Sequence, residues 1–255
     1  DTVTVKSTSS KKITITCDKA DIPTDKKNIA YKAAESFFNA TKIQNKGVSI
    51  DIKKKIPHAA GLAGGSADGA AVIVALNKIY GTQLSNDELC DIGVKVGADV
   101  PFCICGGTLL SQGIGDVLNK VKPLRKCYIL LAKPDFGVNT GYAYSMFDKN
   151  GKVHIPDKLG MLYAMQSRDL TQICSKMENV FEQFIEVPNR VTMKEIMRKH
   201  NALGVCMSGS GPTVFGIYEN KCDAVKAAKE LKPYSADLCI CTPVSKGCKA
   251  EIIEE

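Results

Sequence analysis

Residues 56–77 read IPHAAGLAGGSADGAAVIVALN. The alternating sequence VSIDIK before this stretch predicts a strand, and the apolar run after Ser66 predicts a helix. Three glycines, Gly61, Gly64 and Gly65, therefore lie between a strand and a helix. The first backbone N–H groups of a helix have no partners within it and lie at the positive end of the helix dipole, so they suit a phosphate chain.

These glycines have two interpretations. In the first, a Cβ at any of the three positions would keep the backbone away from an anion or would forbid a positive φ. In the second, they form a tight turn that allows close packing. The segment has neither the GK[ST] ending of a Walker A loop nor the GxGxxG of dinucleotide-binding folds. Its composition alone leaves both interpretations open.

The surrounding sequence predicts the first of two α+β lobes. Residues 1–17 alternate like two strands, and the STSS sequence at 7–10 suits a hairpin turn between them. Helices are expected over 28–40 and over 66–80, and Gly81 suits a left-handed end to the second helix. The lobe therefore has strands before each of its first two helices.

The first lobe is expected to have one more helix, from Asn86 to about Val96, because Ser85 and Glu88 have capping-box spacing.

The second lobe has a different order of elements. The pattern changes near residue 125, so we expect domains at 1–125 and 126–255. Beyond the boundary the order strand, helices, strand, strand, helix, strand is typical of a ferredoxin-like, split βαβ layout.

Composition excludes several classes of protein. The 34 Lys and Arg against 27 Asp and Glu give a net charge of +7, but they are scattered rather than gathered in a nucleic-acid stripe. The 11 cysteines include no CxxC pair and there are three His, which favours reduced thiols over disulfides or zinc. No apolar run approaches the ~18 residues of a membrane span. We expect a cytoplasmic protein without membrane or nucleic-acid partners.

Three motifs, in this order, resemble the GHMP kinases, which include galactokinase and the homoserine and mevalonate kinases. The first is PHAAGLAGGSADGAA at 57–71, which is similar to the phosphate-binding motif of that superfamily. The second is GADVPFCICGG at 97–107, and the third is MSGSGPTVFGIY at 207–218, which resembles the C-terminal glycine-rich motif. The GLAGGS form is similar to the diphosphocytidyl-methylerythritol branch, whereas mevalonate and homoserine kinases more often show GLGSSA.

The resemblance implies a two-lobed GHMP kinase fold. Its N-terminal lobe would contain a left-handed, ribosomal-protein-like βαβ unit, and its C-terminal lobe would be ferredoxin-like. It also implies ATP as co-substrate, Mg²⁺, and a small-molecule acceptor with a cytidine diphosphate group, phosphorylated on its 2-hydroxyl in the non-mevalonate route to isoprenoids. We expect a monomer or a homodimer.

The resemblance also assigns site residues. Asp99 would be the catalytic aspartate, although an Asp before Val100 and Pro101 is also a favoured helix N-cap. ATP contacts are implied for Asn28 and for the glycine-rich segment, namely Pro57, Ala59, Ala60, Gly61, Leu62, Ala63, Gly64, Gly65, Ser66 and Ala67. Substrate contacts are implied for Asp99, Ser208, Gly209, Ser210, Gly211, Thr140 and Phe181.

Several of these residues have a second interpretation. Ser66 would bind phosphate or Mg²⁺, or would be an ordinary N-cap for the helix that follows. Thr140 is expected to be an N-cap that also faces the cleft, and Phe181 matches a position where the family stacks an aromatic ring on cytosine. The segment 208–211 would close over the transferred phosphate, or would be a flexible turn. His58 is assigned no role.

Two family features do not occur in this chain. The family carries a lysine in an AKINL-like strand and a GYH-like segment on the cytidine side, and Lys6 and Lys11 lie in the wrong context to replace that lysine. The chain is expected to begin about forty residues into the family layout, more than terminal fraying would explain. Two alternatives follow: another GHMP acceptor such as mevalonate, homoserine or a sugar, and a nucleotide-binding protein without catalysis.

Overall fold

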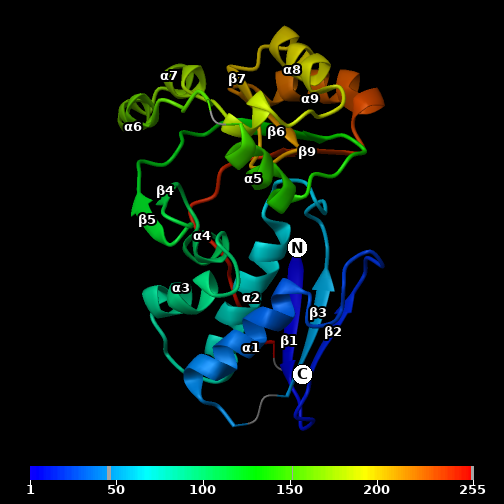
Figure 1. Cartoon of the computed structure of the whole chain (residues 1–255), viewed down its shortest axis with the longest axis vertical. Coiled ribbons are helices and arrows are strands. Elements are labelled where there is room, and N and C mark those ends of the chain that lie inside the picture. Colours follow the sequence, from blue (N-terminus) through cyan, green and yellow to red (C-terminus); the bar gives the residue numbers. More distant parts are fainter. Residues whose placement is uncertain (45–46, 151, 254–255) are drawn as a thin grey trace. The chain divides into compact units, whose positions relative to one another are not determined.

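The computed structural model describes residues 1–44, 47–150 and 152–253, and these fold as two compact units (Figure 1). Unit 1 contains the described residues of 1–56, 63–120 and 244–253. Unit 2 contains residues 57–62 and the described part of 121–243. The chain therefore passes from unit 2 to unit 1 inside the glycine-rich segment, between Leu62 and Ala63. The domain boundary expected near residue 125 stays a prediction.

The sheet of unit 1 has β3 (Val48–Lys53) between its two other strands. β1 (Thr2–Ser7) pairs with β3 antiparallel, and β2 (Ile13–Cys17) pairs with β3 parallel. The predicted hairpin between the first two strands is therefore wrong. Val48, Ile50 and Ile52 of β3 are fully buried on one face of the sheet, and the backbone of β3 has a hydrogen-bonded neighbour along each edge.

Two helices cover this sheet. α1 (Ile29–Thr41) connects β2 to β3 as a parallel crossover, and α2 (Gly64–Ile79) packs along α1 (Figure 1). Gly69 of α2 allows the close approach, because a Cβ there would lie 2.8 Å from Cγ2 of Ile29. The buried core between sheet and helices includes Phe37, Phe38, Ile50, Ile52, Ile73 and Leu76.

Local signals set the elements that complete unit 1. Ser85 and Glu88 form the predicted capping box at the start of α3 (Asn86–Val94). The backbone N–H and the hydroxyl of Ser85 donate to the Glu88 carboxylate and lower its pKa. The remaining elements are α4 (Val100–Cys105) and a hairpin of β4 (Leu109–Gln112) and β5 (Val117–Lys120).

The sheet of unit 2 has the strand order β7–β8–β6–β9, with every neighbouring pair antiparallel. This order confirms the ferredoxin-like layout. The strands are β6 (Tyr128–Lys133), β7 (Gly204–Met207), β8 (Val214–Tyr218) and β9 (Asp237–Cys241). The helices are α5 (Thr140–Lys149), α6 (Lys158–Ser167), α7 (Leu170–Ser175), α8 (Arg190–Lys199) and α9 (Lys221–Leu231), with 3₁₀ turns η1 (Val180–Gln183) and η2 (Lys232–Tyr234).

The core of unit 2 lies between its sheet and the pair α8 and α9 (Figure 1). Leu130 on β6, Met193 and Met197 on α8, and Leu231 on α9 are fully buried there. Within the ranges that the structure describes, no helix is long and apolar enough to cross a membrane.

Ser85→Ala tests the capping box. Losing the N-cap oxygen should lower the free energy of unfolding by about 1 kcal/mol at neutral pH. The lowered pKa of Glu88 stabilises the fold above its unfolded value of about 4.5, and this contribution disappears as the pH falls through the folded pKa. Urea unfolding at pH 7 and in acid should therefore show that the difference in unfolding free energy between the parent and Ser85→Ala becomes smaller in acid. Ser111→Ala on exposed β4 is the matched control, and an equal loss there would contradict the assignment.

Candidate active site

Gly61 is the point where the two glycine-rich motifs meet within unit 2. Its φ is +68°, and a Cβ on it would lie 2.3 Å from the carbonyl oxygen of Ser208 and 2.8 Å from that of Gly211. The hydroxyl of Ser208 donates to the carbonyl oxygen of Gly61 at 2.7 Å. The N–H of Thr213 donates to the carbonyl oxygen of Ala60 at 3.4 Å. The two backbones therefore touch with no room for a side chain.

Ala63 ends the loop in unit 1. It has φ +52° and is the N-cap of α2, which begins at Gly64. The prediction of Ser66 as an N-cap is therefore wrong, because Ser66 is the third residue of the helix. Alanine has no side-chain oxygen, and within the described residues no side chain caps α2. The first-turn N–H groups are thus left for a ligand to satisfy.

Gly64 and Gly65 lie in helical backbone without positive φ. A Cβ on Gly64 would lie 3.0 Å from Cγ2 of Ile56, and one on Gly65 would lie 3.1 Å from Cδ1 of Ile29. Close packing thus accounts for these two glycines, whereas the need for positive φ is confirmed only at Gly61.

Asp99 immediately precedes α4 in unit 1. It is exposed and holds the N-cap position, but its φ of −88° and ψ of −7° are helical, and its side chain makes no capping hydrogen bond. An N-cap side chain accepts from the helix when its own backbone is extended, so this geometry explains why the carboxylate does not cap. The capping interpretation is therefore wrong for the side chain, and among the described residues its carboxylate has no hydrogen-bond or ion-pair partner.

Two of the predicted substrate residues of unit 2, Thr140 and Ser210, lie side by side. The hydroxyls of Thr140 and Ser210 are 3.2 Å apart, and Ser210 is buried. Asn139, not Thr140, is the N-cap of α5, because its side chain accepts from the N–H of Tyr142. An amide oxygen one residue earlier has taken the capping role expected of Thr140.

Phe181 belongs to an aromatic cluster in unit 2. Its ring is half-buried and meets Tyr144 edge-on at a centroid distance of 5.1 Å and Phe184 at 5.8 Å. Its side chain packs against the small core that contains Val138 and Met207. The ring thus has a fixed orientation, which a stacking surface needs.

Asn28 is buried at the start of α1. Its Oδ1 accepts from the N–H of Ala30 at 2.8 Å, and its Nδ2 donates to the carbonyl oxygen of Pro23 at 2.6 Å. The amide therefore fixes the start of α1, and a contact with ATP stays a prediction.

Sequence reasoning missed a buried ion pair beside the start of α2 in unit 1. Nζ of Lys54 lies 2.7 Å from Oδ2 of Asp68 and 2.5 Å from Oδ2 of Asp1, with side chains only 4–6% exposed. Oδ1 of Asp1 also accepts from the N–H groups of Lys55 and Ile56, at 2.5 and 2.7 Å. Burial raises the pKa of Asp68, and Lys54 opposes that shift.

The sequence holds only a weak signal for this network. Lys54 is the middle member of a KKK run, which by composition alone is a solvated patch. Lys54 comes one residue after the strand that ends at Lys53. The alternation of buried and exposed side chains along a strand therefore does not predict whether the side chain of Lys54 is buried.

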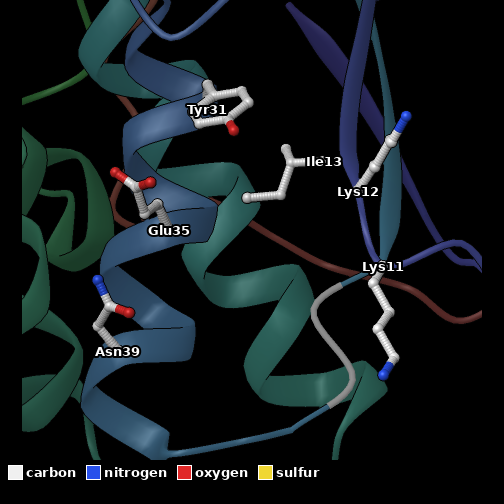
Figure 2. A pocket seen from close by; sticks show the side chains of 6 residues that line it. All are labelled: Lys11, Lys12, Ile13, Tyr31, Glu35 and Asn39. Atoms are coloured by element: carbon white, nitrogen blue, oxygen red, sulfur yellow. The ribbon is translucent and has the colours of Figure 1, made fainter.

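A separate hollow of about 340 Å³ lies between the start of β2 and the side of α1 (Figure 2). Its lining residues are Lys11, Lys12, Ile13, Tyr31, Glu35 and Asn39. The amine ends of both lysines point away from the three α1 side chains in Figure 2. None of the residues predicted to bind ATP or substrate lines this hollow.

Family models match both halves of the chain. The model described as GHMP kinases N terminal domain matches residues 28–107, and the one described as GHMP kinases C terminal matches residues 161–236. A crystal structure of 4-(cytidine 5'-diphospho)-2C-methyl-D-erythritol kinase has a TM-score of 0.73 at 27% identity, covering 94% of this chain and 84% of that one. A homoserine kinase from Cytophaga hutchinsonii has a TM-score of 0.79 at 20% identity, covering 96% and 86%, and shows the fold alone.

Sequence identity distinguishes between the branches that share this fold. A 4-diphosphocytidyl-2-C-methyl-D-erythritol kinase from Clostridium acetobutylicum is 45% identical over 222 residues, which are 86% of this chain and 79% of the relative. One from Caldicellulosiruptor saccharolyticus is 43% identical over 246 residues, or 95% and 84%.

The matches to both family models and the ferredoxin-like second unit show that the chain is a GHMP kinase. Within that superfamily, the chain belongs to the family of 4-diphosphocytidyl-2-C-methyl-D-erythritol kinases.

Gly61→Ala tests the contact between the motifs. Gly81 is the matched control, because it also has positive φ, at +58°, but a Cβ there has no neighbour within 4 Å. Each alanine should cost about 1 kcal/mol of backbone strain. Only Gly61→Ala should also displace the loops and lower kinase turnover by roughly 10-fold or more. Equal turnover in the two variants would show that the contact has no bearing on the site.

Lys54→Met tests the buried ion pair. Removing the lysine leaves the Asp68 carboxylate buried without its counter-charge, so the free energy of unfolding should fall by about 3–5 kcal/mol. Adding Asp68→Asn should restore part of that loss, because the uncompensated charge is then gone. Thermal and urea unfolding of the two single variants and the double variant measure the coupling. Strictly additive losses would contradict the pairing.

Proposed function

We propose that this chain transfers the γ-phosphoryl group of ATP to the 2-hydroxyl of 4-diphosphocytidyl-2-C-methyl-D-erythritol. The observation that supports this reaction best is the Asp99 carboxylate, which is exposed and uses none of its oxygens as a helix cap. The resemblance of residues 97–107 gives Asp99 the role of the catalytic aspartate, and a relative of that name is 45% identical to this chain.

Phosphate binding is assigned to the start of α2. The helix is long, lacks a side-chain cap among the described residues, and begins directly after the glycine-rich segment. Charge-assisted hydrogen bonds of about 1.5–3 kcal/mol each from its free N–H groups would hold the triphosphate. The hydroxyl of Ser66, in the first turn, is the candidate for a further contact to phosphate or metal.

Mg²⁺ is proposed to arrive with ATP. Within the described ranges, no group of three or more His, Cys, Asp or Glu residues could form an all-protein metal site. Mg²⁺ does not require one, because it usually keeps several waters and is bound through one or two carboxylates and the substrate phosphates. The hydroxyl of Ser66 is the candidate protein ligand, and the bound ion would neutralise charge on the phosphates.

In the transfer step, the oxygen of the 2-hydroxyl attacks the γ-phosphorus while the bond to the β–γ bridging oxygen breaks and ADP leaves. The carboxylate of Asp99 orients the hydroxyl and accepts its proton. Because that carboxylate is not occupied by a helix N–H, both of its oxygens are open to the substrate.

Acceptor binding is assigned to unit 2. Phe181 would stack on cytosine, because two aromatic neighbours fix the orientation of its half-buried ring. Ser208, Gly209, Ser210 and Gly211 would contact the transferred phosphate and acceptor, together with Thr140, which lies beside Ser210. The proposal includes a cytoplasmic protein in the non-mevalonate route to isoprenoids, as a monomer or a homodimer.

Asp99→Asn tests the proposed reaction. With saturating ATP and Mg²⁺ and diphosphocytidyl-methylerythritol as acceptor, coupled ADP release should fall by at least ~100-fold, the size expected for loss of a general base. ATP affinity, measured by titration calorimetry, should stay within about threefold, because the triphosphate contacts are elsewhere. Asp91→Asn on the exposed side of α3 is the control and should retain turnover.

Other outcomes separate the alternatives. Turnover of mevalonate or homoserine in place of the cytidine substrate would overturn the acceptor. ATP binding without turnover of any acceptor by the gene product would support a nucleotide-binding protein without catalysis.

A further inference from the structure

The side-chain amide of Asn179 joins the aromatic cluster of unit 2 to the C-terminal glycine-rich loop. Its Oδ1 accepts from the N–H of Phe181 at 2.9 Å. Its Nδ2 donates to the carbonyl oxygens of Met207 and Gly209, each at 2.8 Å. The two ends of one amide thus hold two segments that are about thirty residues apart in sequence.

Capping alone does not explain this arrangement. An Asn that starts the 3₁₀ turn η1 needs only its Oδ1 to accept from the turn. Both donors of the Asn179 amide instead bind carbonyls on the two sides of Ser208. The hydroxyl of Ser208 in turn donates to the carbonyl oxygen of Gly61. Asn179 therefore holds the residues on both sides of Ser208, and Ser208 makes the contact with the first glycine-rich motif.

Other side chains already fix the segment that contains Asn179. Oε1 of Glu182 accepts from the N–H of Met207 at 2.6 Å, and Lys194 forms an ion pair with Glu182. Arg190 donates to the carbonyl oxygens of Ile185 and Glu182, at 2.6 and 3.0 Å. These contacts hold the segment against β7 without Asn179. The Asn179 amide therefore acts mainly on the loop that follows β7, at residues 208–211.

We propose that Asn179 is a positioning residue for phosphoryl transfer, which sets the Ser208–Gly211 loop against Gly61 while keeping Phe181 in place. The inference rests on the proposed function of that loop and that ring. It predicts that the two ends of the amide affect different kinetic parameters. The donor end acts on the chemical step through the loop, and the acceptor end acts on acceptor binding through Phe181.

Asn179→Asp separates the two ends. Aspartate has nearly the same shape and keeps the acceptor for the N–H of Phe181, but it places a carboxylate against two carbonyl oxygens. Losing two hydrogen bonds should lower kcat by roughly 10- to 100-fold. The KM for diphosphocytidyl-methylerythritol should stay within about threefold. Phe181→Leu should do the opposite, with KM raised roughly 10-fold and kcat within about threefold.

Ile196→Val is the control for a general loss of stability. Ile196 is buried in the core of the same unit, on α8, and has no assigned role in the site. Its variant should retain kcat and KM even where its melting temperature falls as far as that of Asn179→Asp. If kcat falls equally in both, or if Asn179→Asp raises KM and leaves kcat unchanged, the inference is overturned.

Hydrogen exchange makes the test independent of turnover. In Asn179→Asp, amide exchange over residues 207–213 should accelerate relative to the parent, while exchange in β6 and β8 stays unchanged. Unchanged exchange over 207–213 would overturn the inference even if the parent phosphorylates the cytidine substrate. A parent that does not turn over this substrate would refute the proposed function, and faster exchange in the variant would still support the positioning of the loop.

Discussion

The contact between Gly61 and the Ser208–Gly211 turn is the constraint on which the candidate site depends. Two backbones approach so closely that even a methyl group on Gly61 would lie 2.3 Å from a carbonyl oxygen. The hydrogen bond from the Ser208 hydroxyl to the Gly61 carbonyl fixes the pair at that distance. Because Gly61 also needs positive φ, both the space and the backbone conformation at this position exclude any other residue.

The glycine-rich segment contributes residues to both units. Residues 57–62 belong to unit 2 and pack against its second glycine-rich loop, whereas α2 begins in unit 1 after Ala63. The later glycines let α2 pack tightly on Ile56 and Ile29. One short motif thus contains glycines of two kinds, one required by loop contact and the others by close packing under the helix.

The polar groups of the site fall into two sets according to whether the fold already uses them. Asn28 and Asn179 have both ends of their amides bonded to the protein, so they hold structure in place. Asp99 lies at the N-cap position of α4 but makes no capping hydrogen bond, and no side chain among the described residues caps the start of α2. Hydrogen-bonding groups that a stable fold leaves unused are the ones a charged substrate can bind without displacing structure.

The sequence by itself determined the features set by near neighbours along the chain. The capping box of Ser85 and Glu88 and the three family motifs were predictable, because each depends on a few adjacent residues. The ferredoxin-like strand order was also predictable, from the succession of elements.

Only the tertiary structure decided the rest. β3 inserts between β1 and β2, which overturns the predicted hairpin, because the backbone groups along both edges of β3 pair with strands that come earlier in the chain. The side chain of Lys54 is buried while its neighbours in the KKK run are exposed, because Asp68 and Asp1 meet it from distant parts of the chain. Asn179 brackets Ser208 across about thirty residues of sequence. Such pairings are set by what folding brings together, and no local pattern records them.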